Sequence, residues 1–241
     1  MKKALLLCGA LLALSASVAA AAGINFNWTD CNGTVNKTFA CNSNTLSGAV
    51  MVGSYIPPAG STAITGEEIV IDLQSSGATL PAWWQFKNTG SCRQTALSTS
   101  ADFTANVNCA DYWQGLAAGG ATAYITPYAT AANRARLLII YATAIANAAP
   151  VDENTEYYAF KATITGAKSV GTGACAGCLD QVCLVLNEIK LTQPAGVGDY
   201  RIQNPAVRNY ITWQGGVVAG GCPAATPTRN TTWGSVKSLY R

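Results

Sequence analysis

Residues 67–74 read Glu-Glu-Ile-Val-Ile-Asp-Leu-Gln, and their alternation decides the fold class. In an extended chain, Ile69, Ile71 and Leu73 fall on one face, because successive side chains of a strand point to opposite sides. A period of two, with β-branched residues on the apolar face, is typical of a half-buried β-strand. This stretch therefore predicts a strand that faces a core.

Similar patterns recur along the chain, separated by Gly, Pro, Asn and Ser. Further strands are predicted over residues 49–56, 121–126, 135–145, 157–164, 182–193 and 209–213, although residues 135–145 also suit a helix. For residues 157–164, the inward set is Tyr158, Phe160, Ala162 and Ile164, and the outward set is Tyr157, Lys161 and Thr163. Many short strands and few helical runs predict an all-β fold: an antiparallel, jelly-roll-like β-sandwich.

The sequence divides into three segments. Residues 1–22 have the form of a secretory signal peptide: Lys2 and Lys3, an apolar run, and small residues before a cleavage point. Residues 23–214 are predicted to form one sandwich domain, and residues 215–241 a Gly/Pro-rich segment with a short helical tail. The tail's apolar residues favour a docked C-terminal helix, with a sorting signal as the alternative. A second short helix is predicted over residues 109–117.

Charge and composition limit the partners. Removal of Lys2 and Lys3 leaves 13 basic against 12 acidic side chains, and only 11% of all residues are charged. Because the positive and negative charges nearly cancel, we expect no positive electrostatic potential that would attract nucleic acid. No second apolar run approaches the ~20 residues of a membrane span, so none is expected after signal cleavage. We expect a protein that is secreted, periplasmic or on the cell surface.

Eight of the nine cysteines remain after the signal peptide, which contains Cys8: Cys31, Cys41, Cys92, Cys109, Cys175, Cys178, Cys183 and Cys222. An even number in an oxidising compartment predicts disulfides. Short loops favour Cys31–Cys41 and Cys92–Cys109. For the other four, Cys175–Cys183 with Cys178–Cys222 is preferred, and Cys175–Cys178 with Cys183–Cys222 is the alternative.

The Cys175-Ala-Gly-Cys178 motif permits two sharper interpretations. A thiolate metal site is disfavoured because the cysteines are irregularly spaced. A redox-active pair is disfavoured because such a motif needs the start of a helix, whereas this one lies in a Gly-rich loop. No metal or cofactor is therefore predicted.

The chain contains no histidine. Catalysis by Ser-His-Asp or Cys-His systems is thereby excluded, whereas hydrolysis by two carboxylates and Ser-Lys chemistry are still possible. The carboxylate candidates are Glu67, Asp72, Asp111 and Glu188.

Two aromatic pairs, Trp83-Trp84 and Tyr112-Trp113, flank the predicted Cys92–Cys109 bridge. Exposed, they would stack on sugar rings and make a candidate ligand site; buried, they would be core. By architecture and composition, and by no specific motif, the chain resembles bacterial carbohydrate-binding or cohesin-type modules. That resemblance implies a polysaccharide or a surface protein as partner.

The acidic turn Asp152, Glu153 and Glu156 offers oxygen ligands for a weak calcium candidate, although a solvated turn explains it better. Taken together, the sequence predicts a secreted, non-enzymatic binding or structural module, with glycan binding as a candidate activity and packing in the core as the preferred role of the tryptophans. The alternatives are a carboxylate-dependent glycoside hydrolase and a cargo domain that carries a C-terminal sorting tail.

Overall fold

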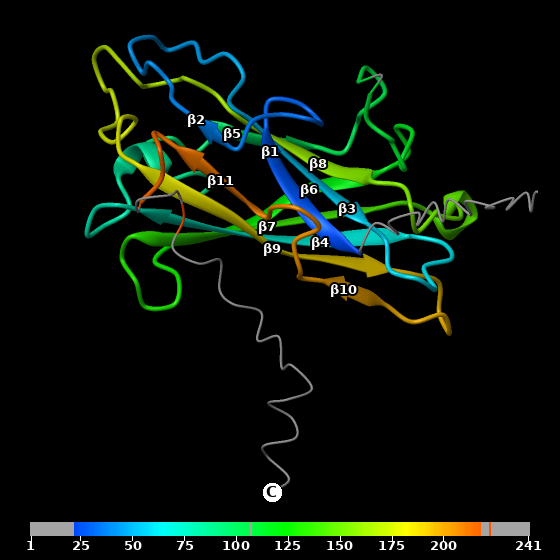
Figure 1. The fold of residues 1–241 in the computed structure, drawn as a ribbon. Helices are drawn as coiled ribbons and strands as arrows, with labels where there is room; N and C mark the ends of the chain where they lie inside the picture. Colours follow the sequence, from blue (N-terminus) through cyan, green and yellow to red (C-terminus); the bar gives the residue numbers. More distant parts are fainter. Residues whose placement is uncertain (1–21, 107, 218–221, 223–241) are drawn as a thin grey trace, which may run out of the picture.

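The computed structural model describes residues 22–106, 108–217 and 222, and their regular secondary structure is almost entirely β-strand (Figure 1). The predicted signal peptide up to residue 21 and the predicted tail helix lie outside these residues. The strands are β1 (Gly23–Trp28), β2 (Asn36–Lys37), β3 (Val50–Ile56), β4 (Gly66–Ser75), β5 (Leu97–Ser100), β6 (Ala118–Ile125), β7 (Arg134–Ala142), β8 (Tyr157–Ile164), β9 (Val182–Thr192), β10 (Tyr200–Ile202) and β11 (Tyr210–Trp213). Two short 3₁₀ helices, η1 (Ala82–Trp84) and η2 (Ile145–Asn147), interrupt the loops. No helix in the described part of the chain has the length and apolar character needed to span a membrane.

The strands form two sheets. The smaller sheet has the order β1-β3-β8-β5, and the larger has β2-β11-β9-β4-β7-β6 with β10 paired to β9. Every strand pair is antiparallel except β2 with β11. Each strand predicted from the sequence overlaps one of these elements. Residues 135–145 are mainly strand β7, whereas residues 109–117 form bends and turns, so the helix predicted there is wrong.

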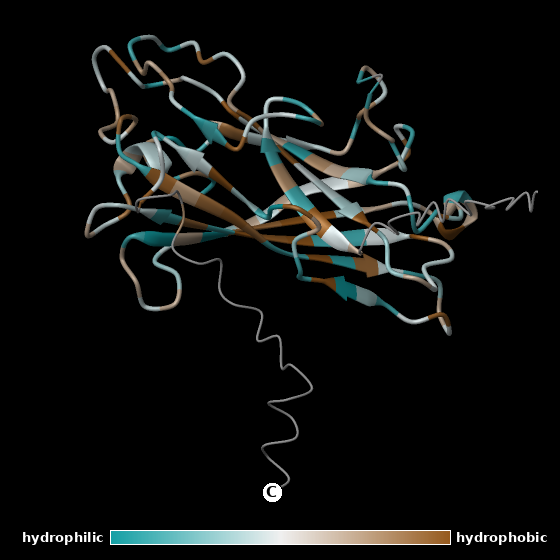
Figure 2. Ribbon diagram, viewed as in Figure 1, coloured by the Kyte–Doolittle hydropathy of each residue, from teal (hydrophilic) through white to brown (hydrophobic). Residues whose placement is uncertain are grey.

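Both sheets contribute side chains to one hydrophobic core. β4 supplies Ile69, Ile71 and Leu73, as its alternation predicts, and β1 supplies Ile24, Phe26 and Trp28. Figure 2 shows hydrophobic residues running along the central strands of the larger sheet, with hydrophilic residues frequent in the loops. The core thus joins elements that are far apart in sequence.

A smaller apolar cluster covers the other face of the smaller sheet. It contains Cys31, Val52, Phe103, Cys109 and Tyr158. A β-bulge in β8 explains how Tyr158 reaches it: Gly53 pairs with Phe160 and Ser54 with Tyr158, so Ala159 is left unpaired. Phe160, Ala162 and Ile164 face the main core as predicted. The prediction for Tyr157 and Tyr158 is wrong, because the bulge exchanges their faces.

Four cysteine pairs lie at disulfide distance: Cys31–Cys109, Cys41–Cys178, Cys92–Cys175 and Cys183–Cys222. The predicted bridges Cys31–Cys41, Cys92–Cys109, Cys175–Cys183 and Cys178–Cys222 are wrong, as is the alternative Cys175–Cys178; only Cys183–Cys222, from that alternative set, is present. The reason is topological. The sheets bring together segments separated by 78, 137 and 83 residues, which outweighs the advantage of short loops.

Candidate functional site

The two aromatic pairs proposed for ligand binding lie in the interior. Trp83 and Trp84 are 0% exposed, Trp113 is 2% exposed and Tyr112 is 9% exposed. Because a sugar ring stacks only on an accessible aromatic face, these residues form no binding platform here.

Trp83 and Trp84 belong to an aromatic cluster closed by Trp213, whose ring centroid lies 5.0 Å from that of Trp83 and 5.1 Å from that of Trp84. The guanidinium of Arg93 lies 3.5 Å from the Trp83 ring centroid and donates to the carbonyls of Trp83 and Thr165. Arg93 is 2% exposed, and burial lowers its pKa to about 10. This buried cation fixes the loop that carries the two tryptophans.

The second pair packs beside Glu67, which is fully buried. Burial raises the pKa of Glu67 to about 8, although the donors of Tyr55 and Trp113 act to lower it. Both carboxyl oxygens nevertheless lack a hydrogen bond of good geometry, as do Tyr55 Oη, Trp113 Nε1 and Tyr141 Oη. Burial thus favours the neutral form of Glu67, and its side chain is enclosed in the protein, out of reach of a polymer substrate.

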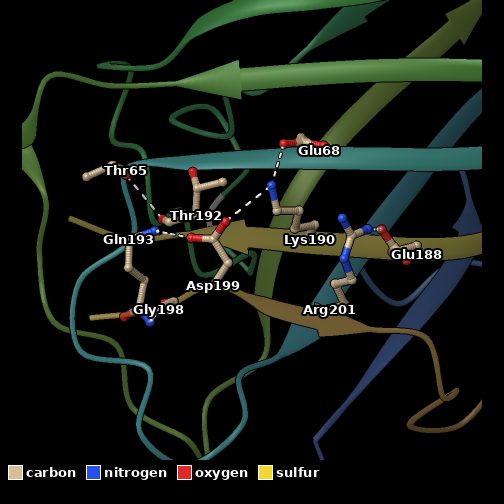
Figure 3. A network of polar contacts seen from close by, with 9 residues as sticks. All are labelled: Thr65, Glu68, Glu188, Lys190, Thr192, Gln193, Gly198, Asp199 and Arg201. Atoms are coloured by element: carbon tan, nitrogen blue, oxygen red, sulfur yellow. Dashed lines mark hydrogen bonds and ion pairs between the residues drawn. The ribbon is translucent and has the colours of Figure 1, made fainter. Parts of the chain in front are cut away.

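The other candidate carboxylates are also engaged. Asp72 receives two bonds from Arg136, at 2.6 and 2.8 Å, and Asp111 accepts the backbone N–H of Trp113. Glu188 is paired with Arg201 at the β9–β10 edge, beside a second ion pair in which Lys190 lies 2.7 Å from Glu68 (Figure 3). Each of these carboxylates thus has a partner within the fold, although Asp111 Oδ2 is buried without one.

The predicted calcium ligands do not converge. Asp152 accepts bonds from Asn154 and Thr155 within its own turn, while Glu156 turns away toward Asn25 and Ser54. In the described residues, the group of three potential ligands that does come together is Asp30, Cys31 and Cys109, and its two cysteines are bonded to each other. The same bonding removes the metal and redox interpretations of Cys175 and Cys178.

A pocket on the outer face of β1, lined by both polar and apolar groups, is the best candidate site among the described residues. We call it the asparagine pocket. It has a volume of about 340 Å³ and is lined by Asn25, Asn27, Cys31, Asn32, Gly33, Val35, Glu156, Val207 and Arg208. β1 alternates Ile24, Phe26 and Trp28 with Asn25 and Asn27, so one face of this strand enters the core and the other faces the pocket.

The floor of the pocket is held by hydrogen bonds. Asn25 donates to Glu156 Oε1 at 2.7 Å and accepts from the backbone N–H groups of Val207 and Arg208, at 2.8 and 3.3 Å. Ser54 also donates to Glu156 Oε1. Burial, followed by the charges of Glu156 and Asp30, raises the pKa of Tyr158 to about 12. The sequence pattern did not lead us to predict this site, although the alternation in residues 23–28 places Asn25 and Asn27 on one face of the strand.

Comparison with known proteins leaves the family open. No family model matches the chain, and no curated protein matches it. Among solved structures, a cohesin module from a Clostridium perfringens family 33 glycoside hydrolase is similar at 7% identity and a TM-score of 0.34, over 80% of this chain and 97% of that module. So distant a likeness carries no argument about function.

Proposed function

We propose that this chain is an extracytoplasmic β-sandwich module that binds a partner and performs no catalysis. Two mainly antiparallel sheets around one core support the sandwich, and four cysteine pairs at bonding distance support an oxidising location. The signal-like residues 1–22 agree with that location.

The observation that carries the proposal is the solitary acid of the asparagine pocket. Glycoside hydrolysis needs two carboxyl groups, about 5 Å apart or 6.5–9.5 Å apart, across the scissile bond. Glu156 is the one acidic residue that lines this pocket, and Glu67, Asp72 and Glu188 are buried or ion-paired elsewhere. The lining of the pocket offers the fixed hydrogen-bonding groups that a binding site requires. It does not offer the pair of acidic residues that glycoside hydrolysis requires.

The test combines binding and turnover in one sample. Oxidised mature protein is incubated with cellulose, chitin and soluble neutral polysaccharides, and both retention on the polymer and new reducing ends are measured. We expect retention on at least one polymer without reducing ends above a protein-free control. Release of reducing ends that disappears in Glu156→Gln would instead establish a hydrolase.

A further inference from the structure

We propose that the asparagine pocket binds a single unit of a neutral saccharide, with Glu156 Oε2 as the acceptor of a sugar hydroxyl. This inference rests on the proposed binding function and names its ligand class and its site. It is independent of the buried tryptophans.

The carboxylate of Glu156 is held in one orientation. Its Oε1 atom accepts bonds from Asn25 Nδ2 at 2.7 Å and from Ser54 Oγ at 2.5 Å, while Oε2 has no hydrogen-bond partner among the described residues. Asn25 is itself fixed by the backbone of Val207 and Arg208. A charged acceptor fixed in this way costs little entropy when a hydroxyl binds to it.

The remaining polar groups complement a hydroxylated, uncharged ligand. Arg208 lies with its guanidinium 5.5 Å from the Tyr210 ring centroid and forms no ion pair within the described residues. Its charge balances that of Glu156, the other charged residue of the lining, and Asp30 adjoins the lining residue Cys31, which disfavours a simple anion. A sugar hydroxyl both donates and accepts, so it satisfies the carboxylate, the guanidinium and the amides of Asn27 and Asn32 in turn.

Size and apolar contact agree with a sugar unit. The volume of about 340 Å³ falls within the range of small-molecule sites. Val207 is 84% exposed at the rim and offers an apolar surface to the C–H face of a pyranose.

The wall of the pocket is tied down independently of any ligand. The Cys31–Cys109 bridge and the bond from Tyr158 Oη to the Cys31 carbonyl, 2.9 Å long, anchor the turn that follows β1. Asn27 adds a third tie: in the amide orientation that satisfies the site, it donates to the carbonyl of Gly33 at 3.3 Å. A preformed wall favours specific binding of a small ligand.

The test is calorimetric titration of the oxidised mature protein with D-glucose, D-galactose, D-mannose and N-acetyl-D-glucosamine, and with glycine as a zwitterionic competitor. We expect one or more sugars to bind and glycine not to bind. Glu156→Gln keeps an acceptor for Asn25 and Ser54 but replaces Oε2 with a donor, so the affinity should fall by about tenfold or more. Glu153→Gln removes an equal charge from an exposed position in the same turn and should bind as the wild type does.

Three results would overturn the inference: no heat with any sugar, equal affinity in wild type and Glu156→Gln, or binding of glycine in place of sugar. Failure of the broader proposal looks different. Release of reducing ends would contradict a non-catalytic module even with sugar in the pocket, whereas retention on a polymer that Glu156→Gln does not weaken would leave a binding module that uses another surface.

Discussion

At the residue scale, the most consequential side chain is the buried Glu67. Its pKa rises from the ordinary value of 4.5 to about 8, mainly because burial penalises the charged form. A carboxyl that is harder to ionise when folded lets the folded state keep a proton that the unfolded state releases. Its contribution to stability therefore falls as the pH rises from about 4.5 to about 8 and is constant above that.

Replacing Glu67 with glutamine should remove this pH dependence. Across that window the wild type should lose up to about 1.4 kcal/mol per pH unit from this group, and the variant should not. Urea unfolding at a series of pH values measures the difference. Glu153→Gln is the control, and parallel stability curves for Glu67→Gln and wild type would contradict the assignment.

Arg93 provides a second test at the same scale. Lysine cannot reproduce a guanidinium that donates to two carbonyls and stacks on Trp83, so Arg93→Lys should destabilise the fold by about 2–3 kcal/mol. Arg201 is the exposed ion-pair partner of Glu188, so Arg201→Lys should lower the free energy of unfolding by less than about 1 kcal/mol. Equal losses in chemical denaturation would mean that Arg93 plays no special part.

At the element scale, the bulge in β8 decides which side chains reach the core and which reach the outer face. Gly53 lies opposite it, and a Cβ atom there would come within 2.1 Å of the Phe160 ring. The absence of a side chain at residue 53 therefore allows the aromatic ring to fill the space above β3.

Gly53→Ala should accordingly cost about 1–3 kcal/mol through overpacking. Gly77→Ala is a matched control, because a Cβ at that position meets nothing closer than 3.6 Å and its φ is not positive. Thermal unfolding of both variants compares them, and a neutral Gly53→Ala would show that the ring can move aside freely.

Strand β8, compared with β4, shows which parts of the fold could be predicted from the sequence and which could not. Alternation in β4 correctly predicted Ile69, Ile71 and Leu73 as core, since a regular strand preserves its period. It failed at Tyr157 and Tyr158, because one unpaired residue, Ala159, reverses the faces and has no local signal. The asparagine pocket was missed for a related reason: Glu156, Asn25 and Arg208 meet only after β1, β8 and the β10–β11 loop are assembled.

At the scale of the whole molecule, the disulfides join segments that the sheets bring together. Each links positions far apart in sequence, with a separation of 137 positions for Cys41–Cys178 and 39 for Cys183–Cys222. Sequence proximity could not reveal these partners, because the pairing follows from strand order.

Removal of Cys41–Cys178 by paired serine substitution should destabilise the protein by about 5 kcal/mol, and removal of Cys183–Cys222 by about 4 kcal/mol, in the loop-entropy description. Peptide mapping without reductant checks the connectivity, and denaturant unfolding checks the order of the two losses. Recovery of Cys31–Cys41 or Cys92–Cys109 peptides would contradict the fold itself.

The central claim, that the asparagine pocket binds without catalysing, is tested most directly by the side-chain amide signals of Asn25, Asn27 and Asn32 in a nuclear magnetic resonance titration with neutral oligosaccharides, whose glycosidic bonds a hydrolase could cleave. We predict that shifts begin at these amides and at the Arg208 guanidinium and saturate with one dissociation constant, while the sugar stays intact. Amides of the pocket that stay unmoved by every sugar, or a sugar that is cleaved during the titration, would contradict the account.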